Sequence, residues 1–188
     1  MMKSRKRAFW ITRTGIFIAL LVVVQYFTQP MSQFVTGSAV NLILASAVLL
    51  SGFSSGVAVA VLSPLFAFLL GIPAFIQLVP FIMVANVFWV SAWHLLAGDR
   101  SLSGGKLYLR YSVALVAGAV VKAAALYFGV VKLAVPCLLP SPQPAQAKAI
   151  SAMFSLPQLI TAAIGGALTV LLVPAVRRAL RKSRTPKA

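Results

Sequence analysis

Lys122 lies where its residue type is least expected. It stands in the middle of an apolar stretch, residues 107–131, that is long enough to cross a bilayer. A charged side chain at that depth is costly, so its default interpretation is a functional residue with a partner. The chain's only acidic side chain, Asp99, lies in a polar segment beside Arg100 and Lys106. We therefore expect the partner of Lys122 to be the anionic group of a bound or transported molecule.

Three further polar side chains fall in the outer half or the middle of apolar stretches. Lys122 lies about 11 residues, or roughly 16 Å, from the outer end of its helix, and Asn86 lies about as deep in another. Gln158 and Asn41 are shallower. If these side chains face one another, they line a pocket open to the outside, because polar groups in hydrocarbon are directed into the bundle. They can instead serve only as hydrogen-bonding links between helices.

The surroundings of Lys122 favour an inward orientation. Small residues share its helical face, namely Gly118, Ala119, Ala125 and Gly129. The alternative is snorkelling to the outer surface, but a lysine stem reaches only about 6 Å. Trp89, which follows Asn86, is expected to stack on a ring in the pocket. Ser155 shares a small, polar stripe of the last helix with Gln158.

The amino-acid composition excludes most catalytic and metal-binding sites. The chain has one acidic residue, one histidine (His94) and one cysteine (Cys137). Paired carboxylates, a metal-binding cluster and an internal disulfide therefore cannot be built, and we expect no catalytic residues, no metal and no cofactor. The net charge is +16, and most of the basic residues lie at the tails and in one loop. Membrane topology explains that distribution better than nucleic-acid binding does.

The hydropathy pattern predicts an all-α membrane protein, a bundle of six transmembrane helices in a single domain. Hydrophobic residues make up 61% of the 188, which is typical of a polytopic membrane protein. Glycine and proline mark nearly every helix boundary. The expected helices are residues 9–28, 36–50, 54–70, 74–96, 107–133 and 150–176, followed by a basic tail, 177–188.

Basic residues predict the orientation. They cluster before the first helix, between the fourth and fifth, and after the sixth. With six helices these clusters share one side, so the positive-inside rule places both termini in the cytoplasm. The connection 134–149 then lies outside, as a tether or as a lid.

Several stretches together resemble the substrate-binding S component of an energy-coupling factor (ECF) transporter. They are the basic start with Gly15-x-x-x-Ala19, the segment Val40-Asn41-Leu42-Ile43-Leu44, Ser63-Pro64-Leu65, Gly71-Ile72-Pro73, and the run from Val79-Pro80-Phe81-Ile82 to Asn86. The resemblance implies a multi-pass protein of the bacterial cell membrane. It also implies a transmembrane T component and two cytoplasmic ATPases as partners, which agrees with the absence of a nucleotide-binding motif from this sequence.

The resemblance further implies a vitamin or related micronutrient as the ligand. Its pocket would lie near the outer face, formed mainly by the last three helices and the external loops. Gly15 and Ala19 match the family's Ala-x-x-x-Ala, which docks on the T component, with glycine in place of the first alanine. The expected substrate-binding residues are Lys122, Asn86, Gln158, Asn41, Trp89 and Ser155.

Lys122 adds the inference of a small anionic ligand, such as pantothenate, lipoate or biotin. Lys132 and Lys148 near the mouth would attract it. The alternative function is a structural protein of the cell envelope, of the shape-determining kind and without a small-molecule ligand. Lys122 would then bond to backbone carbonyls or to a partner protein.

Overall fold

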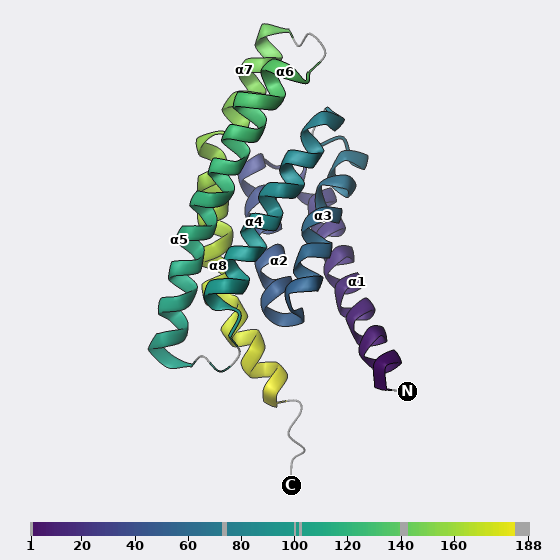
Figure 1. Cartoon of the computed structure of the whole chain (residues 1–188), viewed down its shortest axis with the longest axis vertical. Coiled ribbons are helices and arrows are strands. Elements are labelled where there is room, and N and C mark those ends of the chain that lie inside the picture. The colour runs from purple at the N-terminus through teal and green to yellow at the C-terminus, as the bar shows by residue number, and fades with distance from the viewer. Residues whose placement is uncertain (1, 73–74, 100, 102, 140–142, 183–188) are drawn as a thin grey trace.

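The protein is an all-helical bundle (Figure 1). The computed structural model describes residues 2–72, 75–99, 101, 103–139 and 143–182, and these contain no strand. The helices are α1 (Met2–Thr28), α2 (Gln33–Ser51), α3 (Phe53–Leu69), α4 (Val79–Ala97), α5 (Gly104–Leu126), α6 (Val135–Cys137), α7 (Pro144–Met153) and α8 (Leu156–Lys182). A 3₁₀ turn, η1 (Ile76–Leu78), precedes α4, and a π-helix, η2 (Tyr127–Ala134), continues α5.

Five helical segments of the described chain are long and apolar enough to cross a membrane. They are Arg7–Thr28, Gln33–Ser51, Ile76–Ala97, Gly104–Cys137 and Pro144–Lys182. The remaining apolar helix, α3, has 17 residues and contains Pro64. The predicted all-α membrane architecture is therefore confirmed, whereas six transmembrane crossings remain a prediction.

Helices α2 and α4 lie at the centre of the packing. Helix α2 packs against α1, α3, α4 and α8, and α4 packs against α3 and α5. Figure 1 shows the start of α1, the α4–α5 connection and the end of α8 at one end of the bundle, with α6 and α7 at the other. The described parts of the three basic clusters therefore belong to the same end. The side of the membrane that this end faces is still a prediction.

The expected last helix, 150–176, is wrong as one continuous helix. It is divided at Phe154 and Ser155 into α7 and α8. Pro157 is the second residue of α8, and this position suits proline because the first turn of a helix needs no backbone N–H donors. Helix α8 then runs beyond residue 176 to Lys182, so it includes the start of the expected tail, 177–188. Residues 183–188 lie outside the described part.

Other boundaries also differ. The expected connection 134–149 is partly helical, because it contains α6 and the start of α7. The expected helix 74–96 begins at Val79, and residue 74 itself is outside the described residues. Pro80 occupies the first turn of α4, a position that suits proline.

Close contact between α2 and α8 depends on Gly165. A Cβ atom at this position would lie 2.5 Å from the backbone oxygen of Ser38 and 2.6 Å from Cβ of Asn41. Both distances are far below van der Waals contact, and backbone atoms cannot move aside easily. Only glycine therefore allows α8 to lie this close to α2, and this contact positions Asn41.

Candidate substrate pocket

A cavity of about 510 Å³ lies between the helices. Its lining comes from α1, α2, α3, η1, α4, α5, α7 and α8, and from the connections between α1 and α2, α3 and η1, and α7 and α8. Four of the six predicted binding residues line it, one from each of four helices: Asn41 (α2), Asn86 (α4), Lys122 (α5) and Gln158 (α8). The structure therefore brings together side chains that are far apart in the sequence. Helices α1 to α3 contribute more than the family resemblance implied.

Lys122 forms the centre of a buried polar cluster. Its Nζ atom donates to Oδ1 of Asn41 at 2.5 Å and to Oδ1 of Asn86 at 2.7 Å. The exposed fractions of Lys122, Asn41 and Asn86 are 4%, 1% and 2%. The inward orientation of Lys122 is thus confirmed, and snorkelling is excluded. A lysine ammonium has three N–H donors, so one remains after both amides are satisfied.

No carboxylate of the described residues accompanies this ammonium. Asp99, the chain's only acidic side chain, lies in the α4–α5 connection. Its Oδ1 accepts hydrogen bonds from the backbone N–H and the hydroxyl of Ser101, both at 2.8 Å. These bonds, the backbone one foremost, hold the pKa of Asp99 below its usual range. Two neutral amides are therefore the only polar groups of the described chain bonded to Lys122.

Neighbouring groups fix both asparagines. Asn86 Nδ2 donates to the backbone oxygen of Ala60 in α3 at 3.4 Å, which orients the amide so that Oδ1 meets Lys122. Trp89 Nε1 donates to the backbone oxygen of Asn41 at 3.0 Å. Contacts of this kind are expected if the asparagines serve only as hydrogen-bonding links between helices. They would equally hold the asparagines in place for a ligand, so they are compatible with both interpretations.

The other two predicted binding residues, Trp89 and Ser155, are not among the residues that line the cavity. Trp89 is fully buried, is not part of the pocket lining, and contacts Trp93 edge to face at 5.7 Å. In this arrangement it supports Asn41 through the backbone and does not offer its ring to the cavity. Ser155 is also absent from the lining, and its hydroxyl donates to the backbone oxygen of Ser151.

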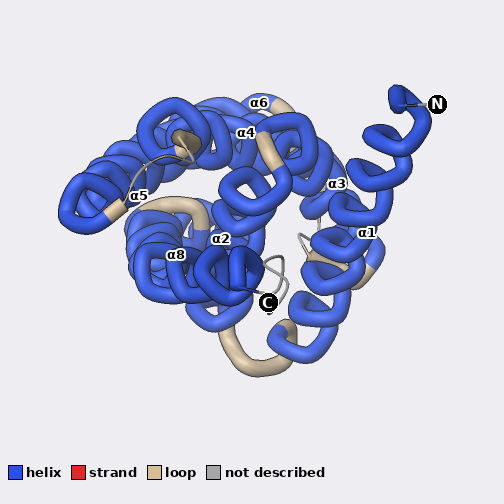
Figure 2. The backbone as a smooth tube through the Cα atoms, turned by 90° about the horizontal axis from the view of Figure 1, so that it is seen from below, coloured by secondary structure: helices blue, strands red, loops and turns tan. Residues whose placement is uncertain are grey.

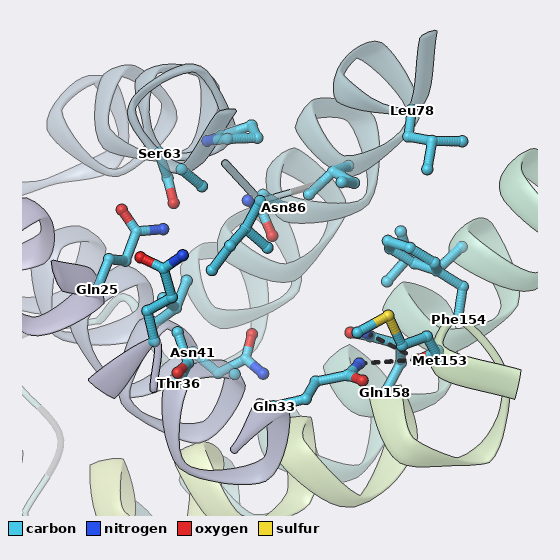
Figure 3. Close-up of a pocket in the computed structure, with 18 of the residues that line it drawn as sticks. Gln25, Gln33, Thr36, Asn41, Ser63, Leu78, Asn86, Met153, Phe154 and Gln158 are labelled. Atoms are coloured by element: carbon cyan, nitrogen blue, oxygen red, sulfur yellow. Dashed lines mark hydrogen bonds between the residues drawn. The ribbon is translucent and has the colours of Figure 1, made fainter. Parts of the chain in front are cut away.

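Three glutamines of the cavity lining donate hydrogen bonds to the ends of helices. Gln33 and Gln158 both donate through Nε2 to the backbone oxygen of Met153, at 2.8 Å and 3.2 Å (Figure 3). Gln29 donates in the same way to the backbone oxygen of Leu70 at 2.9 Å. These carbonyls lie at the C-terminal ends of α7 and α3, where helix carbonyls lack partners of their own. All three glutamines line the pocket.

The glutamine amides leave acceptors for a ligand. A carbonyl can only accept, so each of these side chains must turn its NH₂ group to the helix end, which leaves Oε1 unused. Gln25 makes the point more strongly, since it is 4% exposed and its buried Oε1 has no hydrogen-bond partner among the described residues. Figure 3 shows Gln25 beside Asn41 and Ser63, in the same cavity as Asn86.

Sequence reasoning missed Gln25, Gln29 and Gln33. They lie near the junction of the first two helices, where polar residues are ordinary. Their spacing of four residues resembles one face of a helix, but the three do not share a helix, because α1 ends at Thr28 and α2 begins at Gln33. The sequence therefore held no direct signal that they line one cavity.

The other predicted residues lie outside the cavity. Gly15 and Ala19 are exposed on α1, and, apart from the surrounding turns of α1 itself, no atom comes within 4 Å of the place a Cβ of Gly15 would occupy. That surface is open to a partner, but the docking role itself remains a prediction. Lys132 and Lys148 are exposed and do not line the pocket.

A helical bundle with several membrane-crossing segments and a polar cavity between them defines a multi-pass membrane protein. The sequence model of one family, the substrate-specific component of ECF transporters, matches residues 10–177. The chain belongs to this family, and the predicted resemblance is confirmed. No curated protein and no solved structure matches the chain.

Family membership establishes the general function. The chain is a substrate-binding subunit of a transporter in the cell membrane, and it is not an enzyme, since ATP hydrolysis belongs to partner ATPases. The family also implies association with a T component and a small-molecule substrate. The structural cell-envelope alternative receives no support from this match.

Proposed function

We propose that this chain captures an anionic micronutrient, a vitamin or vitamin precursor, for ATP-driven uptake, and that the acid group binds at Lys122. The observation that supports this most directly is the ammonium in the pocket wall. It has two neutral amide partners, one spare donor and no carboxylate among the described residues. In this proposal Asn41, Asn86 and Gln158 complete the polar surroundings of the ligand.

The energetic argument concerns charge. Two amide oxygens solvate an ammonium but cannot neutralise it, and an uncompensated charge away from water is costly. An incoming carboxylate removes this cost and accepts the remaining N–H as a charge-assisted hydrogen bond. The amides hold Nζ in place beforehand, so little entropy is lost when the ligand arrives.

The free Oε1 acceptors of the glutamines narrow the chemical class of the proposed ligand. A molecule that satisfies them must carry N–H or O–H donors at a distance from its acid group. A cavity of about 510 Å³ is of the size that small cofactors occupy. Pantothenate offers hydroxyls and an amide N–H, and biotin offers ureido N–H groups, whereas lipoate has no donor away from its acid. We therefore favour pantothenate-like or biotin-like acids over lipoate.

The proposal includes a topology and partners. Both termini lie in the cytoplasm and the pocket opens to the outside, as the basic clusters at the opposite end favour. Gly15 and Ala19 dock on the transmembrane T component, through which two cytoplasmic ATPases drive release inward. The exposed α1 surface supports this assignment.

Native mass spectrometry of the purified protein tests the ligand. The expected result is a bound small molecule that carries a carboxylate or phosphate, and a competition series in which pantothenate or biotin displaces it better than lipoate. A retained ligand that is neutral or cationic would contradict the anionic assignment. It would leave the substrate-binding role of the family intact.

A further inference from the structure

A second cavity, of about 470 Å³, lies at the end of the bundle where the basic clusters gather. Figure 2 shows α1 and α8, two of the helices that form it, at this end, and α2 completes its lining. Three arginines line it: Arg13 from α1, and Arg177 and Arg181 from α8. The rest of the lining is mainly apolar and includes Ile16 and Phe17. Charged and apolar surfaces therefore meet in one hollow.

Arg177 is held in position. Its Nη2 donates to the backbone oxygen of Leu49, near the C-terminal end of α2, at 2.8 Å. Its guanidinium carbon lies 5.9 Å from the centre of the Tyr111 ring, a cation–π contact. A guanidinium has five N–H donors in a fixed plane, so most of them remain after this single bond. Arg177 is thus a preorganised cation with unused donors.

The other two arginines have no anionic partner in the described chain. The side chains of Arg13 and Arg181 make no hydrogen bond or ion pair within the described residues. Asp99, the chain's only acidic side chain, bonds to Ser101. Three cations around one hollow repel one another, and an anion between them removes this repulsion. Asp99, which bonds to Ser101, does not supply that anion.

We propose that this second cavity binds the phosphate headgroup of an anionic phospholipid. Arginine forks match phosphate oxygens, and the apolar lining suits the glycerol and the first methylenes of an acyl chain. Basic pockets between helices at a membrane surface are typical lipid-headgroup sites. The apolar lining favours a lipid over free phosphate, which would leave Ile16 and Phe17 uncovered. This inference is independent of the ligand in the first pocket.

Native mass spectrometry from vesicles tests the site. The protein is reconstituted in equal mixtures of phosphatidylglycerol and phosphatidylcholine, and the lipids retained on the ejected protein are counted. The test variant is Arg13→Gln with Arg181→Gln, because neither side chain has a partner in the described structure. The matched control is Lys106→Gln with Arg178→Gln, an equal charge change on exposed residues outside the cavity.

The wild type and the control should retain phosphatidylglycerol preferentially. The test variant should lose most of that preference. A hydrogen bond between a guanidinium and a phosphate contributes roughly tenfold or more, so removing two arginines from the cavity should lower the ratio of retained lipids by at least about tenfold. An equal loss in the control would overturn the proposal in favour of general surface attraction, and an unchanged ratio in the test variant would overturn it outright.

Two further measurements test whether free phosphate or a protein partner occupies the second cavity instead of a lipid. Inorganic phosphate is offered to the wild type and the test variant in the presence of phosphatidylcholine alone. The lipid proposal would be contradicted if the wild type carried phosphate adducts that the test variant lacks, and if the wild type showed no preference for phosphatidylglycerol in the mixed vesicles. Co-purification with the T component is measured in parallel for the wild type and the test variant. If the test variant no longer co-purifies but retains lipids as the wild type does, the cavity belongs to a protein partner and the lipid proposal is wrong.

Discussion

Replacing Lys122 by methionine removes the ammonium from the pocket and leaves a side chain of similar length. The proposed acid then loses its only cation among the residues that line the cavity. Losing one member of a buried, hydrogen-bonded charge pair costs about 2–5 kcal/mol. At about 1.4 kcal/mol for each factor of ten, the lower limit corresponds to roughly 30-fold weaker binding.

The same substitution also affects the unliganded protein. Asn41 and Asn86 lose the donor that their buried Oδ1 atoms share. An unsatisfied buried acceptor costs about 1–3 kcal/mol, so the free protein should unfold more easily. Weaker binding of the acid alone would therefore be ambiguous, because a disturbed pocket would produce it too.

A neutral analogue separates the two effects. Isothermal titration is done with the acid identified from the protein and with its carboxamide, on the wild type and on Lys122→Met. The wild type should bind the acid more tightly, and the variant should bind both nearly equally. Lys132→Met, an equal charge change at an exposed residue outside the lining, should keep the preference within about threefold at physiological salt. An acid preference that survives in Lys122→Met would refute the reasoning.

Three other substitutions test the surroundings. Gly165→Ala should lower the free energy of unfolding by about 1–3 kcal/mol, because its Cβ meets the backbone of α2. The control, Gly105→Ala, should leave that free energy unchanged, because its Cβ meets no other part of the protein within 4 Å. Equal melting curves for the two variants would contradict the close-packing argument. Gln25→Leu should weaken the binding of an acid that carries N–H or O–H donors about 2- to 13-fold, because one hydrogen bond is lost. Its affinity for an acid without such donors should not change. Unchanged affinity for both acids would show that Gln25 is not part of the site. Gly15→Leu should reduce co-purification with the T component while ligand affinity stays constant, and a complex that survives would show that docking lies elsewhere.

Much of the pocket could be predicted because depth in a membrane helix follows from sequence position. A fixed rise per residue placed Lys122 and Asn86 at similar depths, and the cost of polar groups in lipid directed both inward. The structure joins these two residues through Nζ and Oδ1. The sequence could not show that Trp89 lies behind Asn41, because that depends on how α2, α4 and α5 are rotated against one another.

Other features depended on contacts that no single helix encodes. The break before α8 follows from Pro157 at the helix start, yet the apolar stretch around it still suggested one continuous helix. The glutamine acceptors were missed for a similar reason. Gln33 and Gln158 both bond to the backbone oxygen of Met153, a contact between segments that are far apart in the chain.

The central claim is that an acid group of the ligand meets Lys122. The most direct measurement is an experimental structure of the protein with the ligand that it retains. We expect a carboxylate or phosphate oxygen about 3 Å from Nζ of Lys122, with Asn41 and Asn86 still bonded to the same atom. A ligand whose acid group lies elsewhere, while Nζ contacts only the two amides, would contradict the account.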